Sequence, residues 1–386
     1  MRRVYADCQA TTPLRPEVMA AMRAALEDHW GNPSSVHAYG RAARRLVETA
    51  REQVAVLIGA QPTEIFFTSG GTEANNWALR AAAHASRSRG RHIITAATEH
   101  PSVLDTCAHL EEEGFRVTYL PVEPGTGFVR PDVLEDALTD ETTVVSVMYV
   151  NNEVGTVQDI PALVGAVKAR RPEAVFHTDG VQAAGIIPVD VHALGVDLMT
   201  LSAHKIHGPK GVGALWVRRG FPFGPLLYGG GQERRMRAGT ENVVGIVGFG
   251  AAAALAQLER EARANHMRRL RDRFVRLVRE RIPSARLNGP DTFAQGERRH
   301  PGNANFTFPG MPGEALLMRL DMKGIAVSSG SACSSGVVEP SHVLLALGVP
   351  REEAGSSLRI SFGAANTEED VDYVAEELAA IAAELS

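Results

Sequence analysis

Cysteine is scarce in this sequence of 386 residues, and the scarcity excludes several classes of protein. The three cysteines, Cys8, Cys107 and Cys333, are odd in number and far apart. We therefore expect neither a disulfide framework nor a metal site, and a reducing cytoplasm is the expected compartment. The N-terminus also lacks the apolar stretch that is typical of a secretory signal, which favours the same location.

Long apolar runs and a strong charge of either sign are absent too. The longest apolar runs are well short of the roughly 20 residues that a membrane span needs. The net charge is only −5, so we expect neither a membrane nor a nucleic acid as partner. Because 44% of the residues are hydrophobic, the chain can still bury an ordinary core. Its length suggests two or three domains, or one large and one small domain.

Lysine is the second scarce residue, with only four among the 40 basic side chains. One of them ends the segment Ser202-Ala203-His204-Lys205, which follows a hydrophobic run and precedes a glycine-rich turn. A lysine next to a hydroxyl and an imidazole suits a Schiff base to pyridoxal 5'-phosphate (PLP), whose phosphate the small polar neighbours can hold. A surface lysine before a turn is the less favoured alternative.

Short apolar runs alternate with helical or loop segments between residues 65 and 218. The expected strands are 65–68, 92–95, 117–120, 144–148, 174–177, 196–200 and 213–218. This alternation predicts an α/β fold with a mostly parallel sheet that is covered by helices. The spacing of apolar residues before the first strand predicts helix over residues 16–58, with an irregular stretch at 31–35.

The composition changes near residue 250, where a long helix is expected from 244 to 281. The remainder is expected to be a smaller α+β unit with strands at 303–308 and 358–362 and a helix from Thr367. We therefore predict a large domain over 14–250. A small C-terminal domain would combine 1–13 with 251–386 and carry the loop around Cys333.

Polar residues follow several of the expected strands, where ligands of α/β sheets bind. Ser69-Gly70-Gly71-Thr72-Glu73 opens a helix, so its backbone N–H groups could hold an anion, although a simple helix cap is also possible. Asp179 could keep a pyridinium nitrogen protonated, and a turn aspartate is the equally good alternative. His100 could stack on an aromatic ring and shuttle protons, although a lone histidine is more often structural.

Two residues of the C-terminal part are further candidates. Cys333 lies among glycines and serines from Ser328 to Gly336, which favours a reactive, accessible thiol over a small buried one. Arg359 lies in an otherwise apolar strand and needs an anionic partner. A substrate carboxylate and a structural Asp or Glu are equally good candidates for that partner.

In this order, the motifs resemble the cysteine desulfurases of the NifS/IscS type, within the class V aminotransferase family of PLP fold type I. The loop sequence Ser-Ser-Gly-Ser-Ala-Cys resembles the long-loop group of that family. The resemblance extends over nearly the whole chain. It is carried by residues 10–13, 31–35, 67–73, 98–100, 150–153, 177–182, 202–205, 237–240, 328–334 and 358–359.

The resemblance implies a role for each candidate. Lys205 would carry PLP, Asp179 would pair with its pyridinium nitrogen, Gln182 would bond its ring oxygen and His100 would stack on the ring. Cys333 would accept the sulfur of the substrate. The residues expected around the phosphate are Gly71, Thr72, Ser202, Ala203 and His204.

The remaining roles concern the substrate and a second subunit. Asn152 would contact the cofactor and, together with Arg359 and Asn32, the substrate carboxylate. Thr240 would reach the phosphate from the second subunit, which predicts a homodimer with shared sites. The sequence departs from the family pattern at Cys8-Gln9, at Ala203 in place of a common glycine, and at Ala364, where an arginine often stands. None of these departures removes a residue that the chemistry needs.

The implied activity converts L-cysteine to L-alanine, with the sulfur passing as a persulfide on Cys333 to an acceptor protein, as in iron–sulfur cluster assembly. A selenocysteine lyase, a cysteine sulfinate desulfinase or a related PLP β-lyase is the alternative. A non-enzymatic scaffold for cluster assembly is less favoured, because a scaffold has no need of the pair Lys205 and Asp179.

Overall fold

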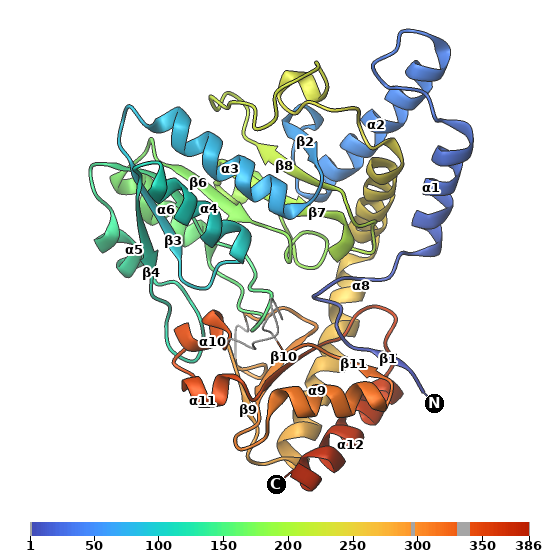
Figure 1. Ribbon diagram of the computed structural model, residues 1–386, viewed down its shortest axis with the longest axis vertical. Helices are drawn as coiled ribbons and strands as arrows, with labels where there is room; N and C mark the ends of the chain where they lie inside the picture. The colour runs from blue at the N-terminus through green and yellow to red at the C-terminus, as the bar shows by residue number, and fades with distance from the viewer. Residues whose placement is uncertain (1, 295–297, 330–339, 386) are drawn as a thin grey trace.

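The structure is a computed structural model, and it describes residues 2–294, 298–329 and 340–385. Its centre is a seven-stranded sheet with the order β2-β8-β7-β6-β5-β3-β4 (Figure 1). The strands from β7 to β4 run parallel, whereas β8 is antiparallel to both of its neighbours. The predicted α/β fold with a mostly parallel sheet is thus confirmed. The strands are β2 (Ile65–Thr68), β3 (His92–Ala96), β4 (Arg116–Leu120), β5 (Thr142–Ser146), β6 (Val175–Asp179), β7 (Leu198–Ser202) and β8 (Gly213–Val217).

Successive side chains of the central strands point to opposite faces of the sheet, and both faces are apolar. On β5, Val144 packs into one buried cluster and Val145 into another. Leu198 and Met199 of β7 divide between the clusters in the same way. Burial on both faces explains why these strands are continuous apolar runs in the sequence. The connecting helices are α3 (Gly71–Ser86), α4 (Pro101–Glu112), α5 (Pro131–Ala137), α6 (Ile160–Arg170) and α7 (Val191–Leu194).

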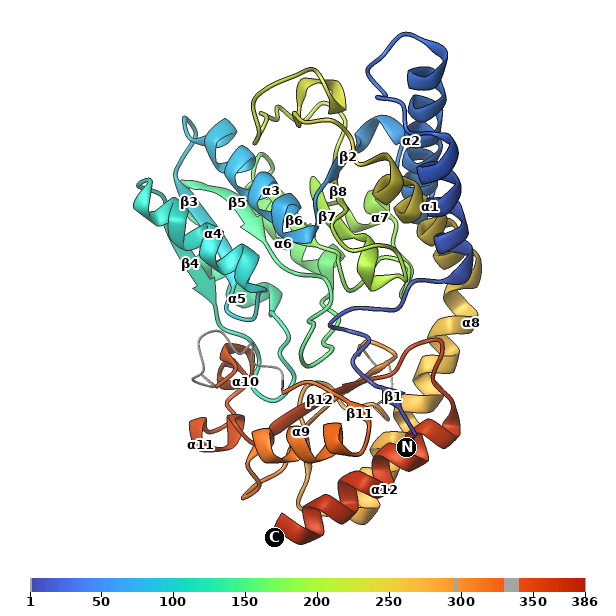
Figure 2. The ribbon, with the colours of Figure 1, turned by 45° about the vertical axis from the view of Figure 1, so that its right-hand side comes forward.

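Three long helices lie beside this sheet: α1 (Pro16–Asp28), α2 (Ala38–Leu57) and α8 (Val243–Arg281). Part of α8 is long and apolar enough to cross a membrane by length and composition alone. Yet Ile246 and Phe249 belong to the core that α2 and the sheet share, and Leu270 and Phe274 belong to a second core. The helix therefore joins two packed units, as the view in Figure 2 makes plain.

The second unit contains a three-stranded antiparallel sheet in the order β12-β10-β9. The N-terminal strand β1 pairs in parallel with β11, and these two strands form a separate small sheet of the second unit. Two helices, α10 (His342–Ala346) and α11 (Arg351–Ala354), instead contribute residues to the core of the large unit. The domain limits near residues 13 and 250 stay predictions. The remaining elements are β1 (Val4–Tyr5), β9 (Arg286–Leu287), β10 (Asn303–Thr307), β11 (Ile325–Ala326), β12 (Ser357–Ser361), α9 (Gly313–Met322) and α12 (Glu368–Leu385).

Candidate active site

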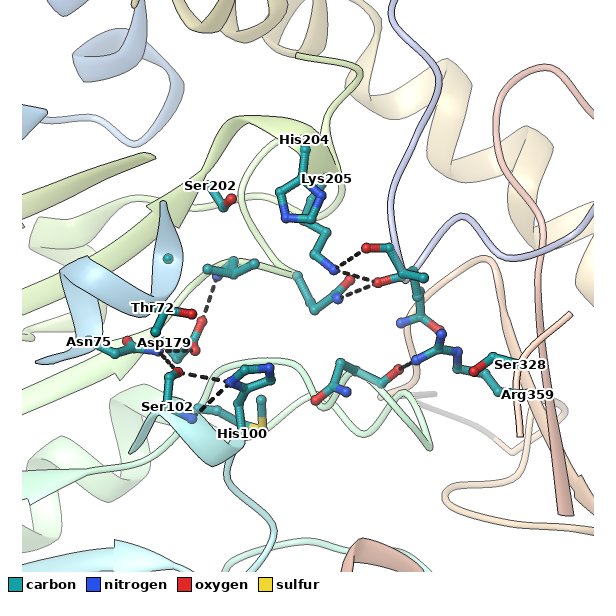
Figure 3. Close-up of a pocket in the computed structure, with 17 residues that line it drawn as sticks. Thr72, Asn75, His100, Ser102, Asp179, Ser202, His204, Lys205, Ser328 and Arg359 are labelled. Carbon is teal, nitrogen blue, oxygen red and sulfur yellow. Dashed lines mark hydrogen bonds between the residues drawn. The ribbon is translucent and has the colours of Figure 1, made fainter. Parts of the chain in front are cut away.

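A cavity of about 410 Å³ opens at the C-terminal ends of β6 and β7 and extends to the second unit. Figure 3 shows Lys205, Asp179 and His100 around this space, with Arg359 across from them. Ligands of α/β sheets bind at this edge of the strands. The lining residues are Gln9, Ala10, Gly71, Thr72, Asn75, His100, Ser102, Met148, Asn152, Asp179, Val181, Gln182, Ser202, His204, Lys205, Ser328 and Arg359.

Lys205 ends the 3₁₀ turn η2 (Ala203–Lys205), which follows β7 directly. Its amine donates hydrogen bonds to the backbone carbonyls of Gln9 at 2.7 Å and of Ala10 at 2.8 Å. Burial, together with the positive charge of Arg359, lowers the pKa of Lys205 to about 8. A substantial fraction of the amine is therefore neutral, and thus nucleophilic, near pH 8.

Asp179 is the last residue of β6 and lies opposite Thr200 of β7. The aspartate and the lysine therefore follow neighbouring strands and lie at the same edge of the sheet. Its carboxylate accepts hydrogen bonds from the side-chain amide of Asn75 at 2.7 Å and from the N–H of Val181 at 2.9 Å. These two donors fix a buried carboxylate in one orientation.

His100 is the N-cap residue of α4, so its ring is held by the helix that follows it. Its Nδ1 accepts the backbone N–H of Ser102 at 3.1 Å, which leaves the proton of a neutral ring on Nε2. The hydroxyl of Ser102 lies 2.8 Å from the same Nδ1 and also accepts a hydrogen bond from Asn75 at 2.9 Å. Although the ring is exposed to the cavity, the surrounding protein desolvates it and lowers the pKa of His100, so it is neutral at pH 7.

The first turn of α3 lines the cavity on the side opposite Arg359. Its N-cap residue, Gly70, offers no side-chain cap. Its backbone N–H groups are therefore available to an anion, which the helix dipole favours.

His204 is held by a hydrogen bond between its Nδ1 and the hydroxyl of Thr11 at 3.1 Å. Burial, aided by the charge of Lys205, lowers the pKa of His204 to about 4, so this ring is neutral as well.

These surroundings fit PLP. An amine and a carboxylate face one space from adjacent strands, and free N–H groups at the start of α3 are suited to a phosphate. The buried amide oxygen of Asn75 has no hydrogen-bond partner among the described residues, so it can still accept one from a ligand. A Cβ at Gly71 would lie 3.0 Å from a methyl group of Val181, which is a tighter contact than side chains normally make, so this wall of the cavity favours glycine.

Arg359 has the structural partner that the sequence left open, and it also lines the cavity. Its guanidinium forms an ion pair with Asp7 at 2.7 Å and donates to the backbone carbonyl of Asn152 at 2.9 Å. Its Nε is buried and has no partner within the described part of the chain. The backbone of Arg359 pairs with that of Ser328 through two hydrogen bonds, of 2.6 and 3.1 Å.

Cys333 lies outside the described residues, but the chain on both sides of that segment is anchored at the cavity. Ser328 is held by Arg359, as described above. After the segment, the hydroxyl of Ser341 donates to the carboxylate of Glu153 at 2.5 Å, and burial raises the pKa of Glu153. The ring of His342 lies within 2.9 Å of the backbone carbonyl of Glu99. The anchoring residues thus directly adjoin His100 and Asn152.

Most candidates from the sequence lie together at this cavity, but three of those in the described residues do not line it. Ala203 is buried and packs against Gly208. Asn32 and Thr240 lie together at a second cavity of about 300 Å³, beside Trp30. Within one chain, neither Asn32 nor Thr240 lines the cavity that contains Lys205. Their roles stay predictions that depend on a second subunit.

The sequence did not indicate the residues that hold the others in place. Asn75 orients Asp179, and Ser102 orients His100. The backbone carbonyl of Gln9 accepts hydrogen bonds from the amine of Lys205 and from the side-chain amide of Gln182. Asn75 left one local signal, since it follows Gly71 by one helical turn on the same face of α3. Gln9 left no such signal, because its backbone carbonyl, and not its side chain, accepts these hydrogen bonds. The other missed lining residues are Ala10, Met148, Val181 and Ser328.

Comparison with known proteins agrees with this geometry. Residues 4–374 match the family model for aminotransferase class V. The chain is 50% identical to "Cysteine desulfurase IscS" of Dictyoglomus turgidum, over 96% of this chain and 92% of that protein. It is 49% identical to "Cysteine desulfurase IscS" of Methanosarcina thermophila, over 97% and 90% of the two chains.

Solved structures of NifS-like proteins resemble this chain over almost its whole length. A "NIFS-LIKE PROTEIN" superposes with a TM-score of 0.92 at 40% identity and covers 99% of this chain and 100% of its own. A NifS-like protein from Rickettsia africae superposes with a TM-score of 0.87 at 33% identity, over 98% and 99% of the two chains.

The chain belongs to the aminotransferase class V family, whose members are PLP-dependent enzymes. Within that family it is a cysteine desulfurase, as the resemblance of its motifs predicted.

Proposed function

We propose that the cavity converts L-cysteine to L-alanine and transfers the sulfur as a persulfide on Cys333 to an acceptor protein. One observation carries the assignment of roles: the amine of Lys205 and the carboxylate of Asp179 face the same space from adjacent strands, with the guanidinium of Arg359 on the far wall. The space can thus hold a cofactor ring on the sheet side and an amino-acid carboxylate on the side of the second unit.

When bound, PLP supplies an electron sink for negative charge at the α-carbon of the substrate. Asp179, fixed by Asn75 and Val181, keeps a proton on the ring nitrogen. Lys205 removes the α-proton, for which a pKa of about 8 suits it. The neutral ring of His100 would lie against the bound cofactor, with its Nε2–H free to serve the reacting groups because Nδ1 is occupied by Ser102.

The substrate is oriented at the opposite wall. Arg359, already turned toward the cavity by Asp7, binds the substrate carboxylate together with the side chain of Asn152. The thiolate of Cys333 then attacks the substrate sulfur. The C–S bond of the substrate breaks as an S–S bond forms on Cys333, and the electron pair stays with the carbon, which takes up a proton to become a methyl group. Return of a proton from Lys205 to the α-carbon completes alanine. No external oxidant or reductant is needed.

The experiment is to incubate the purified holoenzyme with L-cysteine and a reductant, and to quantify alanine and sulfide. We expect equal yields of the two from the wild type, loss of both in Cys333→Ala, and wild-type yields in the control Cys107→Ala, whose thiol is buried in α4. Activity that survives in Cys333→Ala would favour a β-lyase that expels its leaving group directly. If the PLP-loaded wild type formed neither alanine nor sulfide, the proposed substrate would be wrong.

We further propose a homodimer in which Thr240 of one subunit reaches the PLP phosphate bound to the other. Support comes from exposed apolar side chains near the second cavity, where Thr240 and Asn32 lie. Trp30 is 70% exposed and Leu26 is 66% exposed, and both line that cavity. Tyr39 stacks on Trp30 at 5.0 Å and is also exposed. An apolar surface of this kind is typical of a protein–protein interface.

The sulfur acceptor that we propose belongs to iron–sulfur cluster assembly, because curated relatives that are 49–50% identical to this chain are named IscS. We also propose that the enzyme works in the cytoplasm. The free thiols of Cys8 and Cys107 support a reducing compartment.

A further inference from the structure

A strained turn precedes Thr240 in the chain. Glu233, Arg234 and Arg235 form the short helix η3 (Glu233–Arg235), and their φ angles are +39°, +58° and +67°. Non-glycine residues avoid this left-handed region because Cβ crowds the carbonyl oxygen. Three such residues in succession persist only where their surroundings hold them, and strain of this kind gathers at functional segments.

Glu233 supplies the holding contacts at one end of the segment. Its buried carboxylate forms a two-pronged ion pair with Arg51 of α2, with N–O distances of 2.6 and 2.8 Å. It also accepts the backbone N–H of Phe67 in β2 at 2.9 Å. The guanidinium of Arg234 lies 4.1 Å from the centre of the Phe66 ring and donates to the carbonyl of Thr63. The turn is therefore fastened to both α2 and the edge strand.

Glu241 fastens the other end of the segment to the same helix. Its buried carboxylate pairs with Arg44 at 2.7 Å. Arg44 and Arg51 are seven residues apart, so they project from the same face of α2, and Glu48 between them bonds to both at 3.4 and 3.0 Å. We call these five residues, Glu233, Arg51, Glu48, Arg44 and Glu241, the charge ladder.

Between the two ends, the chain passes the phosphate side of the active site. Arg237 forms a two-pronged ion pair with Glu73 in the first turn of α3, at 2.8 and 3.0 Å. Glu73 also accepts the backbone N–H of Ser69 at 2.9 Å. Gly239 and Thr240 remain exposed. In Figures 1 and 2 this yellow segment lies next to α2 and β2, on the outside of the large unit.

We infer that the charge ladder positions Thr240 for the cofactor phosphate of the partner subunit, with Glu233 and Glu241 as its positioning residues. The inference rests on the shared site of the proposed homodimer. A buried ion pair adds little stability compared with an apolar pair of similar size, but its geometry is directional. The pairs Glu233–Arg51 and Glu241–Arg44 hold both ends of the segment 233–241 on one face of α2. With both ends held, the orientation of Thr240 between them is restricted.

The test compares two ligands that differ only in the phosphate. The dissociation constants of PLP and of pyridoxal are measured on dimeric apoenzyme by equilibrium dialysis, for the wild type, Thr240→Ala, Glu233→Gln and Glu241→Gln. We expect each variant to lower the preference for PLP over pyridoxal at least fivefold, with the affinity for pyridoxal unchanged. The double variant Glu233→Gln/Thr240→Ala should lose no more than Thr240→Ala alone, because both changes remove the same contact. Glu52→Gln, an exposed glutamate of α2, is the matched control and should keep the wild-type preference.

The outcomes distinguish a failure of the charge ladder from a failure of the proposed shared phosphate site. If Thr240→Ala keeps the wild-type preference, the shared phosphate site is wrong. If Thr240→Ala loses the preference but Glu233→Gln and Glu241→Gln keep it, the charge ladder does not position Thr240. Equal losses of affinity for PLP and pyridoxal in the two glutamate variants would show a general structural role, which also overturns the inference.

Discussion

Lys205 owes its chemistry to its surroundings as much as to its own amine. Burial and the nearby charge of Arg359 lower its pKa to about 8, while two backbone carbonyls hold the amine at the cavity. An ordinary lysine, with a pKa of about 10.4, is almost wholly protonated at neutral pH and cannot attack an aldehyde. A lysine with so low a pKa suits the covalent attachment of PLP that we propose.

The first prediction concerns the pH dependence of cofactor attachment. Only the neutral amine is nucleophilic, so the rate at which PLP attaches to the apoenzyme should rise with pH and level off above about pH 8, the pKa of Lys205. The measurement is the growth of visible absorbance after PLP is mixed with apoenzyme at a series of pH values. A rate that still climbs toward pH 10 would show that Lys205 behaves as an ordinary lysine. Lys205→Ala should give no such absorbance.

The second prediction concerns Asp179. Asp179→Asn keeps the size of the side chain but removes the charge that holds a proton on the ring nitrogen, so kcat should fall on the order of 10²-fold with PLP still bound. Steady-state alanine production, with bound PLP quantified in parallel, measures this effect. The exposed Asp105→Asn on α4 is the control and should match the wild type. An unchanged kcat in Asp179→Asn would remove Asp179 from the mechanism.

The sequence predicted the titratable groups that line the cavity better than it predicted the residues that hold them in place. Lys205 and Asp179 were found because a rare residue and a carboxylate followed apolar runs, which is a local pattern. Asn75 and Ser102 act through contacts with residues far along the chain, and such contacts leave no local pattern. For Arg359 the sequence predicted only that an anion must be near, and Asp7 was not identifiable because it lies at the other end of the chain.

At the scale of elements, alternation of strand and helix predicted the sheet because each central strand is apolar on both faces. The ends of strands moved by about two residues: β5 was expected at 144–148 and is Thr142–Ser146. Threonines at the start of this strand are buried but polar, so hydrophobicity alone misses them. The two-residue strands β1, β9 and β11 were not predicted, because they are too short for any periodicity.

The third prediction belongs to α10, the helix that begins just after the segment of Cys333. Ser341 caps it by accepting the N–H of Leu344 at 3.2 Å and donates to the buried Glu153. Ser341→Ala should lower the free energy of unfolding by about 1–3 kcal/mol, since it removes a cap and leaves a buried carboxyl unpaired. Urea titration of the holoenzyme measures the change. The exposed Ser284→Ala should stay within about 0.5 kcal/mol of the wild type, and equal effects of the two variants would refute this account of α10.

At the scale of the whole molecule, α8 connects the two cores, and the active site lies where the two units face each other. The sheet side supplies Lys205 and Asp179, and the second unit supplies Arg359 and Ser328. Length and a change of composition near residue 250 suggested a large and a small part. They did not predict that α10 and α11 return to the core of the large unit, because their few apolar residues suit either core equally well.

The fourth prediction tests the association of two subunits. Leu26→Glu places a charge on the exposed apolar surface beside Trp30 and should yield a monomer, because burying an unpaired carboxylate in an interface is unfavourable. Sedimentation velocity measures the state of association. Met318→Glu, on the exposed face of α9 in the second unit, is the control and should remain a dimer. A dimeric Leu26→Glu protein would place the interface elsewhere.

The central claim is that this cavity moves the sulfur of L-cysteine onto Cys333, and a single turnover tests it most directly. Holoenzyme is mixed with less than one equivalent of L-cysteine without reductant, alanine is quantified, and the peptide that contains Cys333 is weighed by mass spectrometry. We predict one molecule of alanine for each Cys333 that has gained one sulfur atom. Alanine formed with free sulfide and an unmodified Cys333, or pyruvate in place of alanine, would contradict the account.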